Sequence, residues 1–137
     1  MLQQAFESSE AAERAFYAAF ERGDVQAMMA VWAPDETIEC IHPHGPRLRG
    51  QEAVRRSWEA ILGAAGGARF TLADRQIVVD GAVALHTLTE TLQVPAQPAA
   101  QVLATNVYRR SGAGWHLILH HASPPFRSGR AARAGLH

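Results

Sequence analysis

The sequence predicts an α+β domain in which three N-terminal helices pack on a strongly curved, mostly antiparallel sheet. Apolar residues recur at helical spacing as far as residue 62 and afterwards alternate at strand spacing. Helices gathered at the front and strands gathered at the back are typical of the α+β class. A chain of 137 residues is most simply one domain. We assign residues 1–124 to this domain and residues 125–137, which lack apolar periodicity, to a flexible tail.

The three predicted helices each carry one apolar face and a recognisable boundary. The first precedes Gly23, a typical stop, and its face is formed by Ala12, Phe16, Ala19 and Phe20. The second begins after Asp24, a good N-cap, and ends before Pro34, with a face of Val25, Met28, Met29 and Trp32. The third follows Gly50 and ends in "GAAGG", with a face of Val54, Trp58, Ile61 and Leu62.

One short strand is predicted between the helices and four long strands after them. The short strand is 37–41, and the long ones are 70–79, 82–94, 101–110 and 115–123. Asp80-Gly81 and "SGAG" mark the turns of two hairpins. The stretch "AVALHTLTETL" alternates, and its apolar outer face predicts a homodimer formed through the sheet. We interpret His86 and Glu90 in this strand as solvent-facing or interface residues.

Composition excludes several classes of protein. Thirteen basic and thirteen acidic residues cancel, so a nucleic-acid partner is not expected. Every basic residue is arginine, which excludes a lysine Schiff base. Cys40 is the single cysteine, so an intrachain disulfide is impossible and a reducing compartment fits. The N-terminus has no signal-peptide profile and no apolar run is long enough for a membrane span, so we expect a cytoplasmic protein without a membrane partner.

Two stretches carry a family resemblance. "FYAAFERGDVQAMMAVWAPDETIECIHPHGPRLRGQEAVRRSWEAIL" resembles the front half of SnoaL-like and ketosteroid isomerase-like domains of the nuclear transport factor two superfamily. "ATNVYRRSGAGWHLILHHAS" resembles the last hairpin of these domains, so the likeness covers about residues 5–124. The resemblance implies a cone-shaped α+β barrel with a deep pocket for a small molecule, commonly in a homodimer.

The resemblance does not extend to the chemistry of the ketosteroid isomerases. Those enzymes carry a proton-shuttling carboxylate just before the proline of the turn, and His42 occupies that position here. The position of their oxyanion-donating tyrosine carries Phe16, with Tyr17 beside it and turned away by about 100° on a helix. The resemblance therefore implies the fold, the pocket and a functional group at His42, but not the isomerase reaction.

The stretch "ECIHPHGPRLRG" supplies the first candidate catalytic residue. Pro43 has no N–H, so we expect it to lift the chain off the sheet and point His42 into the pocket, with Gly45 allowing the return. An imidazole titrates near neutral pH and suits a general base. The alternative is that His42 only orders the turn. His44 is a weaker candidate for contact with a ligand.

The last strand supplies the second candidate catalytic residue. Strand alternation places Trp115, Leu117, Leu119, His121 and Ser123 on one face. The resemblance favours this face for the pocket, which makes His121 a catalytic candidate and Ser123 a ligand-binding candidate. The alternative is that His121 satisfies buried polar groups at the end of the sheet. Four aromatic residues complete the predicted ligand-binding set: Phe16, Tyr17, Trp32 and Trp58.

No cofactor or metal ion is expected. Two histidines at i, i+2 and a third from a distant strand could bind zinc, but the sequence lacks a designated carboxylate partner and the usual ligand spacings. Cys40 lies in an apolar strand and is interpreted as a core residue.

Two functions remain open. One is a proton-transfer enzyme of the isomerase, cyclase, dehydratase or epoxide hydrolase type acting on a small apolar ligand. The other is a non-catalytic ligand-binding or dimerisation module with the same pocket, because the fold does not decide between them.

Overall fold

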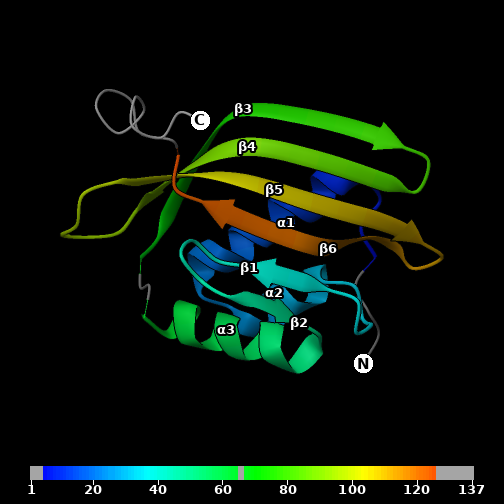
Figure 1. The fold of residues 1–137 in the computed structure, drawn as a ribbon, viewed down its shortest axis with the longest axis horizontal. Helices are drawn as coiled ribbons and strands as arrows, with labels where there is room; N and C mark the ends of the chain where they lie inside the picture. The colour runs from blue at the N-terminus through cyan, green and yellow to red at the C-terminus, as the bar shows by residue number, and fades with distance from the viewer. Residues whose placement is uncertain (1–4, 65–66, 126–137) are drawn as a thin grey trace, which may run out of the picture.

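The computed structural model describes residues 5–64 and 67–125, in which three helices lie on one face of a curved sheet (Figure 1). The helices are α1 (Ser9–Arg22), α2 (Val25–Val31) and α3 (Gln51–Ala64). The strands are β1 (Glu39–Ile41), β2 (Arg47–Arg49), β3 (Arg69–Asp80), β4 (Val83–Gln93), β5 (Ala100–Ser111) and β6 (Gly114–Ser123). The predicted α+β class is confirmed. Residues 126–137 of the predicted tail lie outside the described residues.

The strands form one mixed sheet in the order β2-β1-β6-β5-β4-β3. β1 runs parallel to β6 and every other pairing is antiparallel, so the predicted, mostly antiparallel sheet is confirmed. The sequence did not predict β2, because three residues are too few to show alternation. β2 pairs with β1 and makes the stretch from residue 39 to 49 a hairpin.

The predicted boundary between the first two helices is confirmed. Gly23 ends α1 with φ 66°, a left-handed conformation that glycine adopts without a steric penalty, and its N–H reaches the Phe20 carbonyl. Asp24 then caps α2, because its carboxylate accepts a hydrogen bond of 2.9 Å from the Ala27 N–H. The tight connection holds α1 and α2 against each other beneath the sheet.

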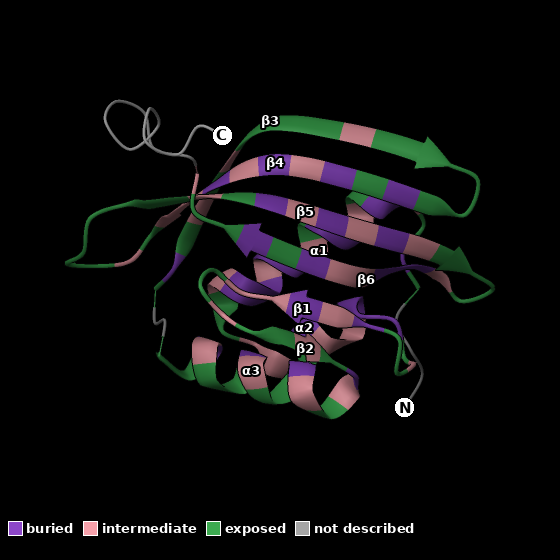
Figure 2. Ribbon diagram, viewed as in Figure 1, coloured by how far each residue is buried: buried purple, intermediate pink, exposed green. Residues whose placement is uncertain are grey.

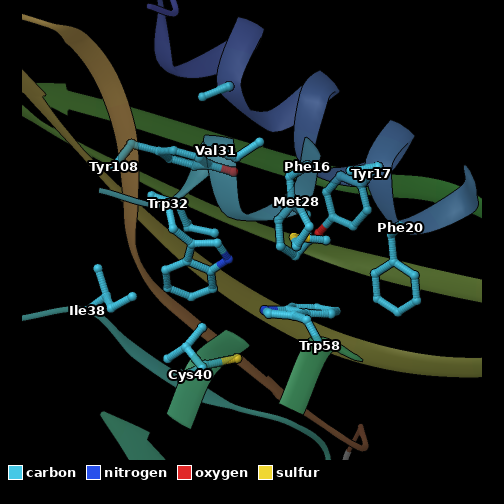
Figure 3. Close-up of a cluster of buried hydrophobic side chains, with 14 of the residues drawn as sticks. Phe16, Tyr17, Phe20, Met28, Val31, Trp32, Ile38, Cys40, Trp58 and Tyr108 are labelled. Carbon is cyan, nitrogen blue, oxygen red and sulfur yellow. The ribbon is translucent and has the colours of Figure 1, made fainter. Parts of the chain in front are cut away.

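The core is an aromatic cluster between the helices and the inner face of the sheet, where buried residues alternate along the central strands (Figure 2). Phe16 and Phe20 from α1 meet Trp58 from α3 edge to face, with ring centroids 5.5 and 5.1 Å apart (Figure 3). Burying each such side chain contributes about 1.5–3 kcal/mol. This cluster fixes the helices that support the site described below.

A bulge in β6 overturns the predicted alternation of that strand. Val107 pairs with Leu119 and Tyr108 pairs with Leu117, so Ile118 is an extra residue in β6. Because one extra residue exchanges the two faces, His120 rather than His121 is buried beyond the bulge. His121 and Ser123 are exposed on the outer face, contrary to the predicted face.

The interpretation of β4 as exposing its polar residues is also wrong. His86 and Glu90 are 1% and 4% exposed and lie on the inner face. Partners from α1 satisfy both: the Glu13 carboxylate lies 2.6 Å from His86 Nδ1, the Ser9 hydroxyl lies 2.9 Å from His86 Nε2, and the Tyr17 hydroxyl donates to Glu90. Buried polar side chains are tolerated when they are paired in this way.

Candidate functional site

A cavity of about 560 Å³ opens between the helices and the inner face of the sheet. Its wall is mostly apolar, and its titratable side chains are those of His42, His44, Glu90 and His120. The remaining lining residues are Phe20, Pro43, Ile61, Phe70, Leu92, Ala100, Gln101, Val102, Ala122 and Pro124. An apolar hollow of this size with a few converging polar groups is typical of small-molecule sites.

His42 reaches the cavity from the turn of the β1–β2 hairpin. It lies one residue beyond β1, and its carbonyl accepts a hydrogen bond of 2.8 Å from the Gly45 N–H. His44, rather than Gly45, takes the positive φ of 63° that reverses the chain. The His42 ring packs edge to face on Trp58 at 4.8 Å, and its Nε2 lies 3.0 Å from the Ser57 hydroxyl. Burial lowers the pKa of His42, which favours the neutral ring.

His120 enters the cavity from the part of β6 beyond the bulge. Its register partner on β5 is Asn106, and His120 Nδ1 lies 2.6 Å from the Asn106 side-chain oxygen. Burial lowers the pKa of His120 to about 3, with smaller contributions from His42 and His121. The ring is therefore neutral at physiological pH.

Glu90 is the carboxyl group of the cavity. The Tyr17 hydroxyl from α1 donates a hydrogen bond to its carboxylate. Burial raises the pKa of Glu90 to about 7; the Tyr17 hydrogen bond opposes the shift, and the charge of Glu13 adds to it. A carboxyl group with this pKa exchanges its proton near neutral pH, as general acid–base catalysis requires.

The carboxyl group and His120 belong to one hydrogen-bonded chain. Asn106 donates from Nδ2 to the Tyr17 hydroxyl at 3.2 Å and accepts from His120 through its oxygen. The His120 ring centroid lies 6.2 Å from that of His42. The cavity thus brings together one proton-exchanging carboxyl group and the neutral imidazoles of His42 and His120, and His44 adds a third histidine to the lining.

The sequence-predicted residues divide into three groups. His42 and His44 line the cavity, and the Tyr17 hydroxyl touches Glu90. Trp58 lies behind the wall, packed on His42. The others lie away from the lining: Phe16 and Trp32 in the core, His121 and Ser123 on the outer face.

Sequence reasoning missed Glu90, His120 and Asn106. The signal for Glu90 was its position four residues after His86, on a strand face that also carries Ala84 and Leu88. All four of these residues are buried. The prediction treated Glu90 as exposed although Ala84 and Leu88, on the same strand face, are apolar. The signal for His120 was hidden by the bulge at Ile118, which the sequence does not mark.

Metal and membrane features were also assessed. Within residues 5–64 and 67–125, no three side chains of the His, Cys, Asp and Glu types are arranged to hold a metal ion. Over the same residues, no helix has the length and hydropathy needed to cross a membrane.

The comparison with protein families identifies the family of this chain. The SnoaL-like domain family matches residues 10–127. The chain belongs to this family. Solved structures with the same fold add that the SnoaL-like domain is part of the nuclear transport factor 2-like superfamily, as the resemblance implied.

Two solved structures share substantial sequence with this SnoaL-like domain. A protein from Thiobacillus denitrificans, described as a candidate calcium/calmodulin-dependent protein kinase type II association domain, is 42% identical, with a TM-score of 0.83 over 88% of this chain and 98% of its own. A protein from Streptomyces avermitilis, described as a candidate dehydratase of the NTF2-like family, is 36% identical, with a TM-score of 0.80 over 87% of this chain and 94% of its own.

A curated relative is much longer than this chain. The F-box protein SKIP8 of Arabidopsis thaliana is 28% identical over 99 residues, which are 72% of this chain and 42% of that protein. The chain therefore spans less than half the length of that relative.

Proposed function

We propose that this SnoaL-like domain is a proton-transfer enzyme acting on a small, uncharged, mainly apolar molecule bound in the cavity. Glu90 takes the role of the group that exchanges the proton, with His42 and His120 as neutral partners beside it. The observation that carries the proposal is a buried carboxyl group with a pKa of about 7 facing an apolar cavity.

The charge of the wall supports an uncharged ligand. Among the described residues, the lining contains no arginine, and the chain has no lysine. A carboxylate or phosphate beside Glu90 would meet its negative charge, and the lowered pKa values of His42 and His120 keep these two imidazoles from acting as cationic partners. The Streptomyces relative described as a candidate dehydratase supports the reaction class, since dehydration needs the removal and delivery of protons.

The experiment measures proton transfer directly. The protein is incubated in heavy water with a panel of uncharged cyclic ketones and hydroxyketones, and exchange of the protons next to the carbonyl group is followed by NMR. Glu90→Gln is expected to lower the exchange rate about a hundredfold or more. The matched control is Glu59→Gln, which alters an exposed carboxylate on α3 and is expected to keep the rate. Equal exchange rates for the wild type and Glu90→Gln would reject the proposal that Glu90 transfers protons in an enzyme.

A second candidate function, a dimerisation module, is favoured by the outer face of the sheet. Val78, Leu85, Val107 and Leu119 are paired in register and form an aliphatic row across β3, β4, β5 and β6. Val78 and Leu85 are 58% and 40% exposed. A second copy of this chain would cover the row about a two-fold axis. The Thiobacillus relative described as a candidate association domain supports this use of the fold.

A further inference from the structure

The hydrogen bonds around Asn106 have a direction that can be assigned. When Glu90 is ionised its carboxylate only accepts, so the Tyr17 hydroxyl must give its single hydrogen to Glu90. The Tyr17 oxygen is then an acceptor, and it faces the Asn106 amide at 3.2 Å. The amide nitrogen of Asn106 is the group that can donate there.

This assignment fixes the other end of Asn106. Its oxygen lies 2.6 Å from His120 Nδ1, and an amide oxygen only accepts. His120 Nδ1 must therefore carry a hydrogen. A neutral imidazole has one N–H, so Nε2 carries a lone pair and no hydrogen.

The unprotonated nitrogen of His120 lies on the side of the ring away from Asn106. Nδ1 is turned toward Asn106 on β5, whereas β1 and His42 flank β6 on its opposite edge. His120 also lines the cavity, and Nε2 has no hydrogen-bond partner among the described residues. The cavity wall thus presents an acceptor that no side chain among residues 5–64 and 67–125 satisfies.

His42 is held differently from His120. Its Nε2 lies 3.0 Å from the Ser57 hydroxyl and 3.4 Å from the Cys40 sulfur, and the Ser57 hydroxyl also reaches the Val54 carbonyl at 2.7 Å. The Ser57 hydroxyl and the Cys40 thiol can each donate or accept, so these contacts leave the tautomer of His42 open. The assignment of a fixed acceptor therefore concerns His120 alone.

We propose that Asn106 is a positioning residue that fixes His120 as a hydrogen-bond acceptor, so that the cavity selects uncharged ligands carrying a hydroxyl or N–H donor on an apolar skeleton. This inference deepens the proposed function and rests on it for the use of the cavity. A ligand with only acceptor groups leaves Nε2 of His120 buried and unpaired, which costs binding free energy. An alcohol, an enol or a phenol is the matching class.

The first test is spectroscopic and needs no turnover. Two-bond proton–nitrogen NMR spectra of histidine-labelled protein distinguish a protonated from an unprotonated ring nitrogen. For His120, identified by its loss in His120→Gln, the expected pattern above neutral pH is a protonated Nδ1 and an unprotonated Nε2. A protonated Nε2 would overturn the proposal, even if the protein proved to be an enzyme.

Two variants separate positioning from a merely structural role. Asn106→Asp keeps an acceptor opposite His120 and is expected to keep the protonated Nδ1. Asn106→Leu removes it and is expected to give a mixture of the two ring forms. An unchanged spectrum in a folded Asn106→Leu would contradict the role of Asn106. If Asn106→Leu fails to fold, the wild-type spectrum and the binding test below still decide.

The binding test uses three probes of one skeleton. β-Naphthol donates a hydrogen bond, β-methoxynaphthalene only accepts, and β-naphthoate is an anion. Calorimetric titration of the wild type is expected to give about tenfold tighter binding of β-naphthol than of the methyl ether, with β-naphthoate weakest. Equal binding of the first two probes would reject donor selection while leaving the proton-transfer function, tested by exchange in heavy water, untouched.

Discussion

Tyr17 on α1 donates its hydroxyl hydrogen to Glu90 on β4, across a sequence separation of 73 residues. The bond ties the first helix to the cavity wall and points a hydrogen-bond donor at the carboxyl group. It therefore couples the packing of α1 to the protonation of Glu90.

Tyr17→Phe is expected to raise the pKa of Glu90 above its value of about 7. The hydroxyl donates to the charged form of Glu90, so its removal favours the protonated form. The carboxyl-carbon NMR shift of Glu90 against pH measures the change. Tyr108→Phe is the control, because the Tyr108 hydroxyl makes no hydrogen bond to Glu90, and an equal upward shift in both variants would argue against the Tyr17 bond as the cause.

Glu90→Gln is expected to change how the stability of the fold depends on pH. The pKa of Glu90 is raised from 4.5 to about 7 by folding, so its protonated form stabilises the fold below pH 4.5 and this contribution is lost as the pH rises through 7. The free energy of unfolding of the wild type should fall by about 3 kcal/mol relative to Glu90→Gln between about pH 4.5 and pH 8. Urea titrations at several pH values measure it, and parallel curves for the two proteins would contradict the raised pKa.

Glu13→Ala is expected to lower the free energy of unfolding by about 3–5 kcal/mol, because it leaves buried His86 without its carboxylate and breaks the ion pair with Arg75. Glu10→Ala is a matched control on the same helix. Glu10 also approaches Arg75, at 3.8 Å, but its side chain is 54% exposed, so its loss should cost less than about 1 kcal/mol. Similar losses in the two variants would show that burial of Glu13 is not what makes its ion pair matter.

His42→Ala is expected to keep the fold and to lose most of the proton-transfer activity. The ring is half-buried at the cavity and packs on Trp58, so its removal should cost about 1–2 kcal/mol, whereas proton exchange in heavy water should fall about a hundredfold. His121→Ala is the control from the exposed face of β6. A large loss of stability with an unchanged rate of proton exchange would show that His42 orders its turn and takes no part in proton transfer.

Leu103→Asp is expected to turn a dimer into a monomer in light scattering. Leu103 is 47% exposed on the outer face of β5, and a charge there would be buried without a partner in the proposed interface. Ala60→Asp, which adds the same charge to an exposed position of α3, should leave the mass unchanged. A wild-type protein of monomer mass at micromolar concentration would contradict the dimer.

The helices and long strands could be predicted because their physical signals are local. Gly23 and Asp24 mark a helix boundary by backbone conformation and capping alone, and the structure has both features. The position of His42 beyond a strand end followed similarly from Pro43. The three-residue strand β2 could not be predicted, since its pairing with β1 is a tertiary contact.

The candidate site was predicted only in part, because its remaining residues depend on long-range packing. His120 replaces His121 at the cavity through a bulge at Ile118, whose cause lies in the pairing with β5. Glu90 can be buried because the Tyr17 hydroxyl from α1 donates a hydrogen bond to it. The two residues are 73 positions apart, and no local sequence pattern predicts that they pair. A rule that polar strand residues face water fails where a helix supplies their partners.

The titration of the Glu90 carboxyl group tests the central claim most directly. In glutamate-labelled protein, the carboxyl-carbon NMR signal that disappears in Glu90→Gln belongs to Glu90, and its shift is followed from about pH 3 to pH 9. The account predicts a midpoint of about 7, so that Glu90 both takes up and releases a proton at neutral pH. A midpoint near 4.5, the ordinary value for a glutamate, would mean a carboxylate that stays ionised and would contradict its assignment as the proton-exchanging group.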